Sequence, residues 1–309
     1  MKLIVFGVLL ISTFVCSEQK IYTFESDHRG FHTKSFFYNN GEEIIAFGGQ
    51  FTPQIAEKAI EFLRTKTTNP LSYLIITHPN PDKFNGSSVF RKHGAQVICS
   101  QSTAVAIPEV HNYKKYYFVH IAKMFTEETY PQMPMIDIVF EKTLEIYLRN
   151  GERFIIEEHD QPGISSTQTL VSFPLTKSLF VGDLIHHKAH AWLEGGIVNG
   201  QAQATIDLWM EHLDYIVANY SDYKVYGGRG EAIYAVVAVK EQIRYLKTVV
   251  KITKTYIRNL GNSKGELKGS EAPKHHKAIE NIIAESFPDY KVNYMIRFGI
   301  YGLINALLE

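Results

Sequence analysis

A short apolar run that ends in a polar loop places the strongest constraint on the fold of this chain. The run "LSYLIITH", residues 71–78, has the length and β-branched character of a buried strand. It follows a segment, 52–67, that opens with Thr52 and Pro53 and carries apolar residues at helical spacing. The next segment, "SSVFRKHGAQVICS", predicts another helix and another strand. This alternation indicates a layered α/β architecture.

The rest of the chain extends this pattern. Residues 20–49 alternate apolar and polar side chains around an Asn-Asn-Gly turn, which predicts an antiparallel hairpin. Further strands are expected at "TLEIYL", "RFIIEEH", "TQTLVSFP", "SLFVGDLI" and "KVYGG", with a helix at "TIDLWMEHLDYIVANY". From Ala232 onward the sequence becomes mainly helical, and we interpret the polar break at 261–276 as a surface loop.

The N-terminus has the pattern of a secretory signal peptide. A single basic residue, Lys2, precedes the apolar run from Leu3 to Val15, and cleavage is expected after Ser17. We therefore divide the chain into a signal peptide (1–17), an α/β domain (18–235) and a C-terminal helical extension (236–309). The mature chain is expected to be secreted or periplasmic, with no membrane span. Its one cysteine would be Cys99, so no internal disulfide is expected.

The composition favours a globular protein. Hydrophobic residues make up 45% of the 309 residues, and 32 basic side chains balance 32 acidic ones. A chain without a net positive charge gives no reason to expect a nucleic acid partner.

Four segments that contain polar side chains lie within predicted strands or directly after them. They are "THPNPDKFNG", "QPGISSTQT", "FVGDLI" and "YGGRGEA", and they contain His78, Asn80, Asp82, Lys83, Ile164, Ser165, Asp183 and Arg229. With their flanks, these segments resemble the metal-binding landmarks of the metallo-β-lactamase superfamily over about residues 21–231. The resemblance implies an αββα four-layer sandwich with its site at the loop ends of two facing sheets. The helices after residue 235 would then be an appendage.

The same resemblance implies a hydrolase site, but most of its metal ligands are replaced. His78, Asp82 and Asp183 match expected ligands, whereas Asn80 and Lys83 occupy histidine positions in the first loop. A gapless alignment also places Ile164 and Arg229 where two further histidines are expected.

Ligand chemistry argues against a standard two-zinc site. Zinc needs three or four deprotonated N, S or O donors, which protonated lysine, arginine and isoleucine do not supply. We therefore expect no cofactor, although one weakly bound zinc on His78, Asp82 and Asp183 remains an alternative. Our hypothesis is that Lys83 and Arg229 replace the metal's charge, because buried carboxylates without a partner are costly.

These considerations assign roles to particular side chains. We assign His78, Asp82, Lys83 and Asp183 to the catalytic group. The assigned substrate-binding residues are Asn80, Arg229, His190, Trp192 and Ser165. The tract "IHHKAHAW" has two interpretations, a replacement metal site or a pocket wall, and we favour the wall because adjacent residues on an extended segment point to opposite sides. The run "HNYKKYYFVHIAKMF" predicts a helix or lid over the cleft, with an apolar wall from residues 116–118.

Two functions are compatible with this pattern, so enzymatic activity stays open. The first is a hydrolase acting on a small ester, lactone or amide through a single-metal or metal-free site. The second is a catalytically inactive protein that binds an anionic small ligand through Lys83 and Arg229. Metal analysis with a turnover screen distinguishes them.

Overall fold

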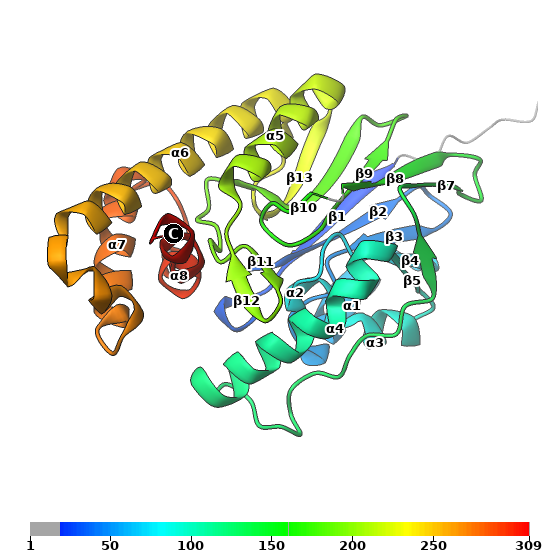
Figure 1. Ribbon diagram of the computed structural model, residues 1–309. Coiled ribbons are helices and arrows are strands. Elements are labelled where there is room, and N and C mark those ends of the chain that lie inside the picture. The colour runs from blue at the N-terminus through cyan, green and yellow to red at the C-terminus, as the bar shows by residue number, and fades with distance from the viewer. Residues whose placement is uncertain (1–18, 160, 309) are drawn as a thin grey trace, which may run out of the picture.

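Two six-stranded sheets face each other and carry helices on their outer sides (Figure 1). The computed structural model describes residues 19–159 and 161–308. The first sheet has the strand order β1-β2-β3-β4-β5-β6, and the second has the order β14-β13-β10-β9-β8-β7. The expected α/β sandwich is therefore present.

The first sheet begins with the predicted antiparallel strands and continues with parallel ones. Its strands are β1 (Lys20–Glu25), β2 (Lys34–Asn39), β3 (Ile44–Phe47), β4 (Leu71–Ile75), β5 (Gln96–Ser100) and β6 (Ile138–Phe140). The helices between them are α1 (Pro53–Arg64), α2 (Pro81–Phe84), α3 (Ser87–Lys92) and α4 (Gln101–Tyr116), and the short turn η1 (His28–Gly30) precedes β2. Helix α1 starts as its sequence predicts, because the Thr52 side chain accepts a hydrogen bond from the Ile55 N–H and Pro53 follows it.

The second sheet contains the longest strand, β10, at its centre. Its strands are β7 (Thr143–Tyr147), β8 (Arg153–His159), β9 (Gln168–Phe173), β10 (Ser178–His187), β13 (Lys224–Gly230) and β14 (Ile233–Tyr234). A small hairpin, β11 (Gly196–Val198) and β12 (Gln201–Gln203), precedes α5 (Ile206–Tyr220). Strands β10 and β13 pair in parallel, so both deliver their C-terminal ends to the same edge of the sheet.

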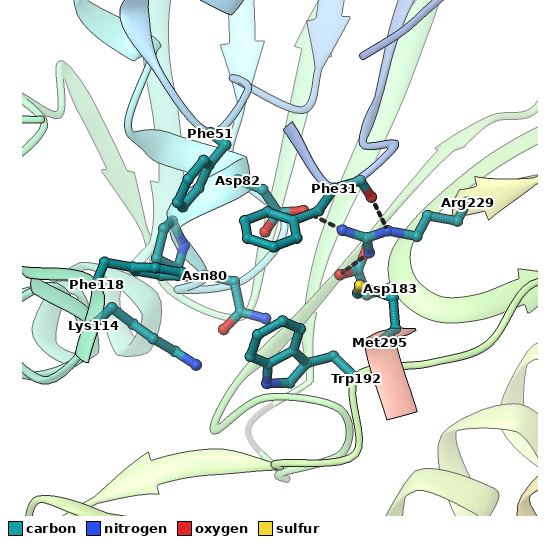
Figure 2. Close-up of a pocket in the computed structure, with 11 residues that line it drawn as sticks. Phe31, Phe51, Asn80, Asp82, Lys114, Phe118, Asp183, Trp192, Arg229 and Met295 are labelled. Atoms are coloured by element: carbon teal, nitrogen blue, oxygen red, sulfur yellow. Dashed lines mark hydrogen bonds and ion pairs between the residues drawn. The ribbon is translucent and has the colours of Figure 1, made fainter. Parts of the chain in front are cut away.

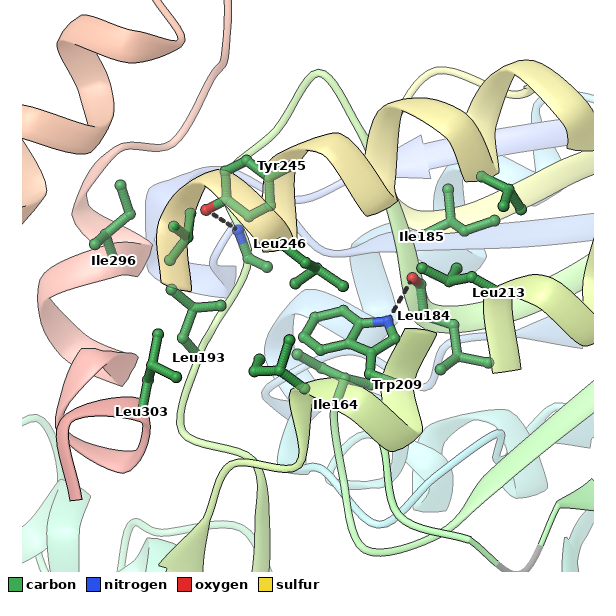
Figure 3. Close-up of a cluster of buried hydrophobic side chains, with 14 of the residues drawn as sticks. Ile164, Leu184, Ile185, Leu193, Trp209, Leu213, Tyr245, Leu246, Ile296 and Leu303 are labelled. Atoms are coloured by element: carbon green, nitrogen blue, oxygen red, sulfur yellow. Dashed lines mark hydrogen bonds between the residues drawn. The ribbon is translucent and has the colours of Figure 1, made fainter. Parts of the chain in front are cut away.

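Three apolar clusters separate the layers. One lies between the first sheet and α1, α3 and α4, and another lies between the two sheets, where the rings of Phe47 and Phe180 stack with centroids 3.8 Å apart. The third joins the second sheet to α5 and the C-terminal helices around Trp209 (Figure 3). The C-terminal helices thus share a core with the sandwich.

The C-terminal region consists of α6 (Ala235–Asn259), η3 (Gly261–Lys268), α7 (Ala272–Ser286) and α8 (Tyr294–Leu308). The interpretation of 261–276 as a loop was wrong for most of its length. Eight of these residues form the 3-10 turn η3, and α7 begins at Ala272 with Pro273 in its first turn. Within the described residues, none of the helices combines the length and apolar character required to cross a bilayer.

Candidate functional site

The ends of three strands and one short helix bring the predicted landmark residues together. His78 and Asn80 follow β4, and Asp82 and Lys83 lie on α2. Asp183 lies on β10 and Arg229 on β13, which pairs with β10. Figure 2 shows Asp82, Asp183 and Arg229 pointing toward one another from separate elements.

Two cations bridge the two carboxylates. The Lys83 ammonium lies 2.8 Å from Asp82 Oδ2 and 2.7 Å from Asp183 Oδ1. The Arg229 guanidinium lies 3.3 Å from Asp82 Oδ2 and 3.2 Å from Asp183 Oδ2. We call these four side chains the ion-pair cluster. It contains two positive and two negative charges, so it is electrically balanced.

Arg229 uses its remaining donors within the protein. Its Nε donates to the Phe31 carbonyl at 2.8 Å, and Nη2 donates to Thr33 Oγ1 at 3.1 Å. The Thr33 hydroxyl in turn donates to Asp82 Oδ2 at 2.9 Å. A side chain that is only 4% exposed and bound on all sides has little capacity left for a ligand.

The cluster keeps both carboxylates ionised despite their burial. Burial by itself raises the pKa of Asp183, but the charges of Lys83 and Arg229 outweigh it and hold that pKa well below its usual range. The pKa of Asp82 is lowered against the same burial effect, chiefly by Lys83. The opposite charges also raise the pKa of Arg229, although its burial acts in the other direction. Such mutual support is what a buried ion pair requires.

Two histidines lie beside the cluster without joining it. The Nε2 atoms of His78 and His186 are each 3.6 Å from an Asp183 oxygen, which is beyond hydrogen-bond distance. Burial lowers the pKa of His186, so this imidazole is neutral near pH 7. His78 Nδ1 instead contacts Thr77 Oγ1 at 3.0 Å.

As built, this group does not fit the zinc ions that the fold's resemblance implies. The Lys83 ammonium occupies the space between the two carboxylates, and an ammonium is not a metal ligand. In the described part of the chain, no three His, Cys, Asp or Glu side chains are grouped to hold a metal ion. The geometry therefore does not favour the weak zinc site that was considered as an alternative on His78, Asp82 and Asp183.

A glycine makes room for the cluster on β13. A Cβ atom added at Gly228 would lie 1.7 Å from Asp183 Oδ1, well inside van der Waals contact. Only glycine lets the β13 backbone approach the Asp183 carboxylate this closely. The sequence "YGGRGEA" thus reflects close packing around the cluster.

A pocket opens beside the cluster and is walled mainly by apolar side chains (Figure 2). Its cavity volume is about 40 Å³, within about 390 Å³ of free space that includes the opening to solvent. Its lining residues are Phe31, Phe51, Asn80, Pro81, Asp82, Lys114, Phe118, Asp183, Trp192, Arg229 and Met295. Aromatic walls with a few polar groups are typical of small-molecule sites.

A second buried ion pair lies at the pocket's other side. Lys114 on α4 pairs with Glu194, and the Trp192 indole N–H donates to Glu194 Oε2 at 3.0 Å. The Lys114 ammonium also lies 5.0 Å from the Trp192 ring centroid, in a cation–π arrangement. Helix α8 packs closely behind this wall, because a Cβ at Gly299 would lie 2.5 Å from the Leu193 nitrogen and 3.0 Å from Trp192.

The other predicted site residues differ in their position relative to the pocket. Trp192 and Asn80 line the pocket, and Ser165 lies beside it, with its hydroxyl 3.4 Å from Asn80 Oδ1. Lys83 lies beneath the pocket wall, only 2% exposed.

The assignment of His190 to substrate binding was wrong. It is fully buried against Tyr245, Phe287 and Tyr290 of the C-terminal region. Ile164, which the sequence alignment placed at a ligand position, lies in the core around Trp209 (Figure 3). The hydroxyl of its neighbour Ser165 contacts Asn80, which lines the pocket.

The adjacent histidines of β10 point in different directions, as expected for an extended segment. His186 faces Asp183, whereas His187 lines a wider cleft beyond Arg229.

Of the aromatic run after Lys115, Phe118 lines the pocket but Tyr116 is exposed, so only part of that run forms the wall. Helix α4 continues into the π-helical turn η2 (Tyr117–Ile121), which carries Phe118.

Sequence reasoning missed the contribution of Lys114, Glu194 and Met295. Lys114 was part of the basic-aromatic run, but its partner Glu194 lies 80 residues away. The only available signal was the unusual density of charged and aromatic residues in both segments.

No protein-family model matches the sequence, and no curated protein matches it either. Solved structures do match. A metallo-β-lactamase from Pontibacter korlensis aligns with a TM-score of 0.54 and 15% identity, covering 74% of this chain and 99% of the other. The metallo-β-lactamase FIM-1 from Pseudomonas aeruginosa, in its mono-zinc form, aligns at 0.52 and 14% identity, with 74% and 89% covered.

The stereoselective inverting sec-alkylsulfatase Pisa1 from Pseudomonas sp. is also similar, with a TM-score of 0.56 and 11% identity. That alignment covers 77% of this chain but only 42% of the sulfatase. Together these similarities show that the chain has the metallo-β-lactamase fold. At such low identity they show the fold alone.

Proposed function

We propose that this chain is a ligand-binding protein on the metallo-β-lactamase fold, in which the ion-pair cluster replaces the metal centre. The observation that carries the proposal is the position of the Lys83 ammonium, within 2.8 Å of both Asp82 and Asp183. A protonated amine held between two carboxylates supplies the positive charge that a metal ion would otherwise supply.

The chemistry of the cluster supports binding over catalysis. Hydrolysis requires an activated nucleophile and an electrophile that stabilises developing negative charge. Here both carboxylates are neutralised and the Arg229 donors are taken up by protein acceptors. The Ser165 hydroxyl contacts Asn80 and has no histidine partner among the described hydrogen bonds.

The pocket supplies the binding site in this proposal. Phe31, Phe51 and Phe118 pack on one another, and Phe31 also packs edge-on against Trp192. Together with Met295 these side chains form the apolar part of the pocket lining. Binding an anion through Lys83 and Arg229, as first expected, is not supported, because both side chains already pair with carboxylates.

A binding experiment tests the proposal directly. We expect the neutral fluorescent probe N-phenyl-1-naphthylamine to bind, and Phe118→Ala to weaken its binding. Phe125→Ala is the matched control, because Phe125 also packs on Phe51 but does not line the pocket. Equal affinity in both variants would place the probe elsewhere and refute the binding role of this pocket.

A turnover screen tests the competing function. The alternative is a hydrolase of a small ester, lactone or amide. It is favoured by the position of Asp82 and Asp183 in the pocket lining and by the activities named for the similar structures. We expect no chelator-sensitive turnover of nitrophenyl esters, a chromogenic β-lactam or an alkyl sulfate, and no stoichiometric metal by elemental analysis. Chelator-sensitive turnover would establish the hydrolase.

We also propose that the chain is exported through its N-terminal signal. The first 18 residues lie outside the described part of the chain, so the support for export is the sequence pattern alone. Mass spectrometry of protein from a secreting host tests this, with cleavage expected after Ser17. An intact Met1 terminus on exported protein would contradict the assignment.

A further inference from the structure

The pocket is bordered by two ion-pair groups that leave no net charge. Lys83 and Arg229 balance Asp82 and Asp183 on one side. Lys114 balances Glu194 on the other side. The six Lys, Arg, Asp and Glu side chains therefore sum to three positive and three negative charges.

One cation nevertheless keeps donors available to a ligand. An ammonium carries three N–H donors, and Glu194 is the one hydrogen-bond acceptor placed on the Lys114 amine within the described residues. Lys114 is 5% exposed and its amine reaches into the pocket between Asn80 and Trp192 (Figure 2). The Asn80 amide, whose oxygen faces the Ser165 hydroxyl, adds a second polar group there.

We infer that the pocket selects an uncharged aromatic ligand that carries a carbonyl-type hydrogen-bond acceptor. This inference rests on the proposed binding function and specifies its ligand class. The aromatic body packs on Phe31, Phe51 and Phe118, and the acceptor takes a free Lys114 donor.

Charge balance gives the reason for an uncharged ligand. A charged group that is removed from water needs a compensating partner, and each charge around this pocket already has one. A ligand carboxylate on Lys114 would compete with the nearby Glu194 carboxylate, which also holds the Trp192 indole. A ligand cation would meet Lys114, which already occupies the face of Trp192.

A matched pair of probes tests this inference. 2-Naphthamide and 2-naphthoate share one ring system and differ in charge at neutral pH. By isothermal titration calorimetry we expect 2-naphthamide to bind at least about tenfold more tightly, because the naphthoate carboxylate must leave water without an unpaired cation to compensate it, a cost that the amide avoids.

Two variants separate the charge argument from general apolar binding. Glu194→Gln leaves a net positive charge at the pocket, so we expect the affinity for 2-naphthoate to rise about tenfold and approach or exceed that for the amide. Lys114→Met removes the donor and should abolish the advantage of the amide over naphthalene itself. Lys115→Met is the matched control, because Lys115 is the next residue on α4 but pairs with Glu127 away from the pocket.

The possible outcomes test the selection for an uncharged ligand separately from the proposed binding function. If neither 2-naphthamide nor N-phenyl-1-naphthylamine binds, the proposed binding function fails and the ligand class fails with it. If the unmodified protein binds 2-naphthoate as tightly as 2-naphthamide, the binding function stands and the selection for an uncharged ligand is overturned. An amide preference that survives Lys114→Met also overturns the assigned role of Lys114.

Discussion

Replacing Asp183 by alanine tests the ion-pair cluster most directly. The Asp183 carboxylate is 2% exposed and lies 2.7 Å from the Lys83 ammonium and 3.2 Å from the Arg229 guanidinium. Its removal leaves both cations with Asp82 as their only remaining carboxylate in the cluster. The buried group then carries an uncompensated positive charge.

The expected loss of stability is large. Breaking a buried ion pair by removing one partner costs about 3–5 kcal/mol, because the remaining charge stays desolvated. At roughly 2–4 °C per kcal/mol for domains of comparable size, the melting temperature should fall by about 6–20 °C. Calorimetry and urea denaturation measure this change.

Two comparisons make the result specific to charge. Asp183→Asn should destabilise the protein, and adding Lys83→Met should recover part of the loss, because the double variant restores electrical balance. Glu145→Ala is the surface control, since Glu145 pairs with Arg153 in solvent and its loss should leave the melting temperature almost unchanged. An unchanged melting temperature for Asp183→Ala would refute the reasoning about the cluster.

Four further predictions use other features. Chelator should leave the melting temperature unchanged, whereas a drop would reveal a bound metal that stabilises the fold. Burial lowers the pKa of His190 from 6.5 to about 4, so on acidification the unfolded chain binds a proton before the folded protein does, and the free energy of unfolding should decrease between about pH 6.5 and pH 4. Urea denaturation at these two pH values should show a smaller decrease for His190→Gln than for the unmodified protein. An equal decrease would exclude His190 as the cause. Gly228→Ala should destabilise the protein by forcing β13 away from Asp183, seen as a lower melting temperature, and a normal one would show that the strand can shift freely. Ile164→Ala should cost about 2–5 kcal/mol in urea denaturation while probe affinity stays constant, and weakened binding would return Ile164 to the site.

Local sequence patterns predicted most of the sandwich because each strand and helix carries its own signal. The Thr52-Pro53 start, the apolar run before His78 and the alternation in the first hairpin all depend on residues close in the chain. The meeting of Asp82, Lys83, Asp183 and Arg229 followed from the resemblance, because the order of the strand-end loops is a property of the fold.

Features that depend on side-chain direction were harder to predict. At the third landmark, Ile164 points into the core around Trp209, whereas the next side chain, Ser165, contacts Asn80, and the sequence alone does not show which of two adjacent residues faces the site. His190 was misassigned because its partner Tyr245 lies in α6, far along the sequence. The pairing of Lys114 with Glu194 likewise depends on tertiary contacts that no local pattern contains.

The contact between Trp192 and α8 has a practical consequence for anyone who shortens the chain. Met295 and the close packing at Gly299 place part of the pocket wall less than fifteen residues from the last residue. A fragment cut after β14, to the dimensions of the smaller lactamases, would lose this wall and expose the apolar core that α6, α7 and α8 share with the second sheet. The pocket is complete only when Phe31, near one end of the described chain, and Met295, near the other, have packed into the same cluster.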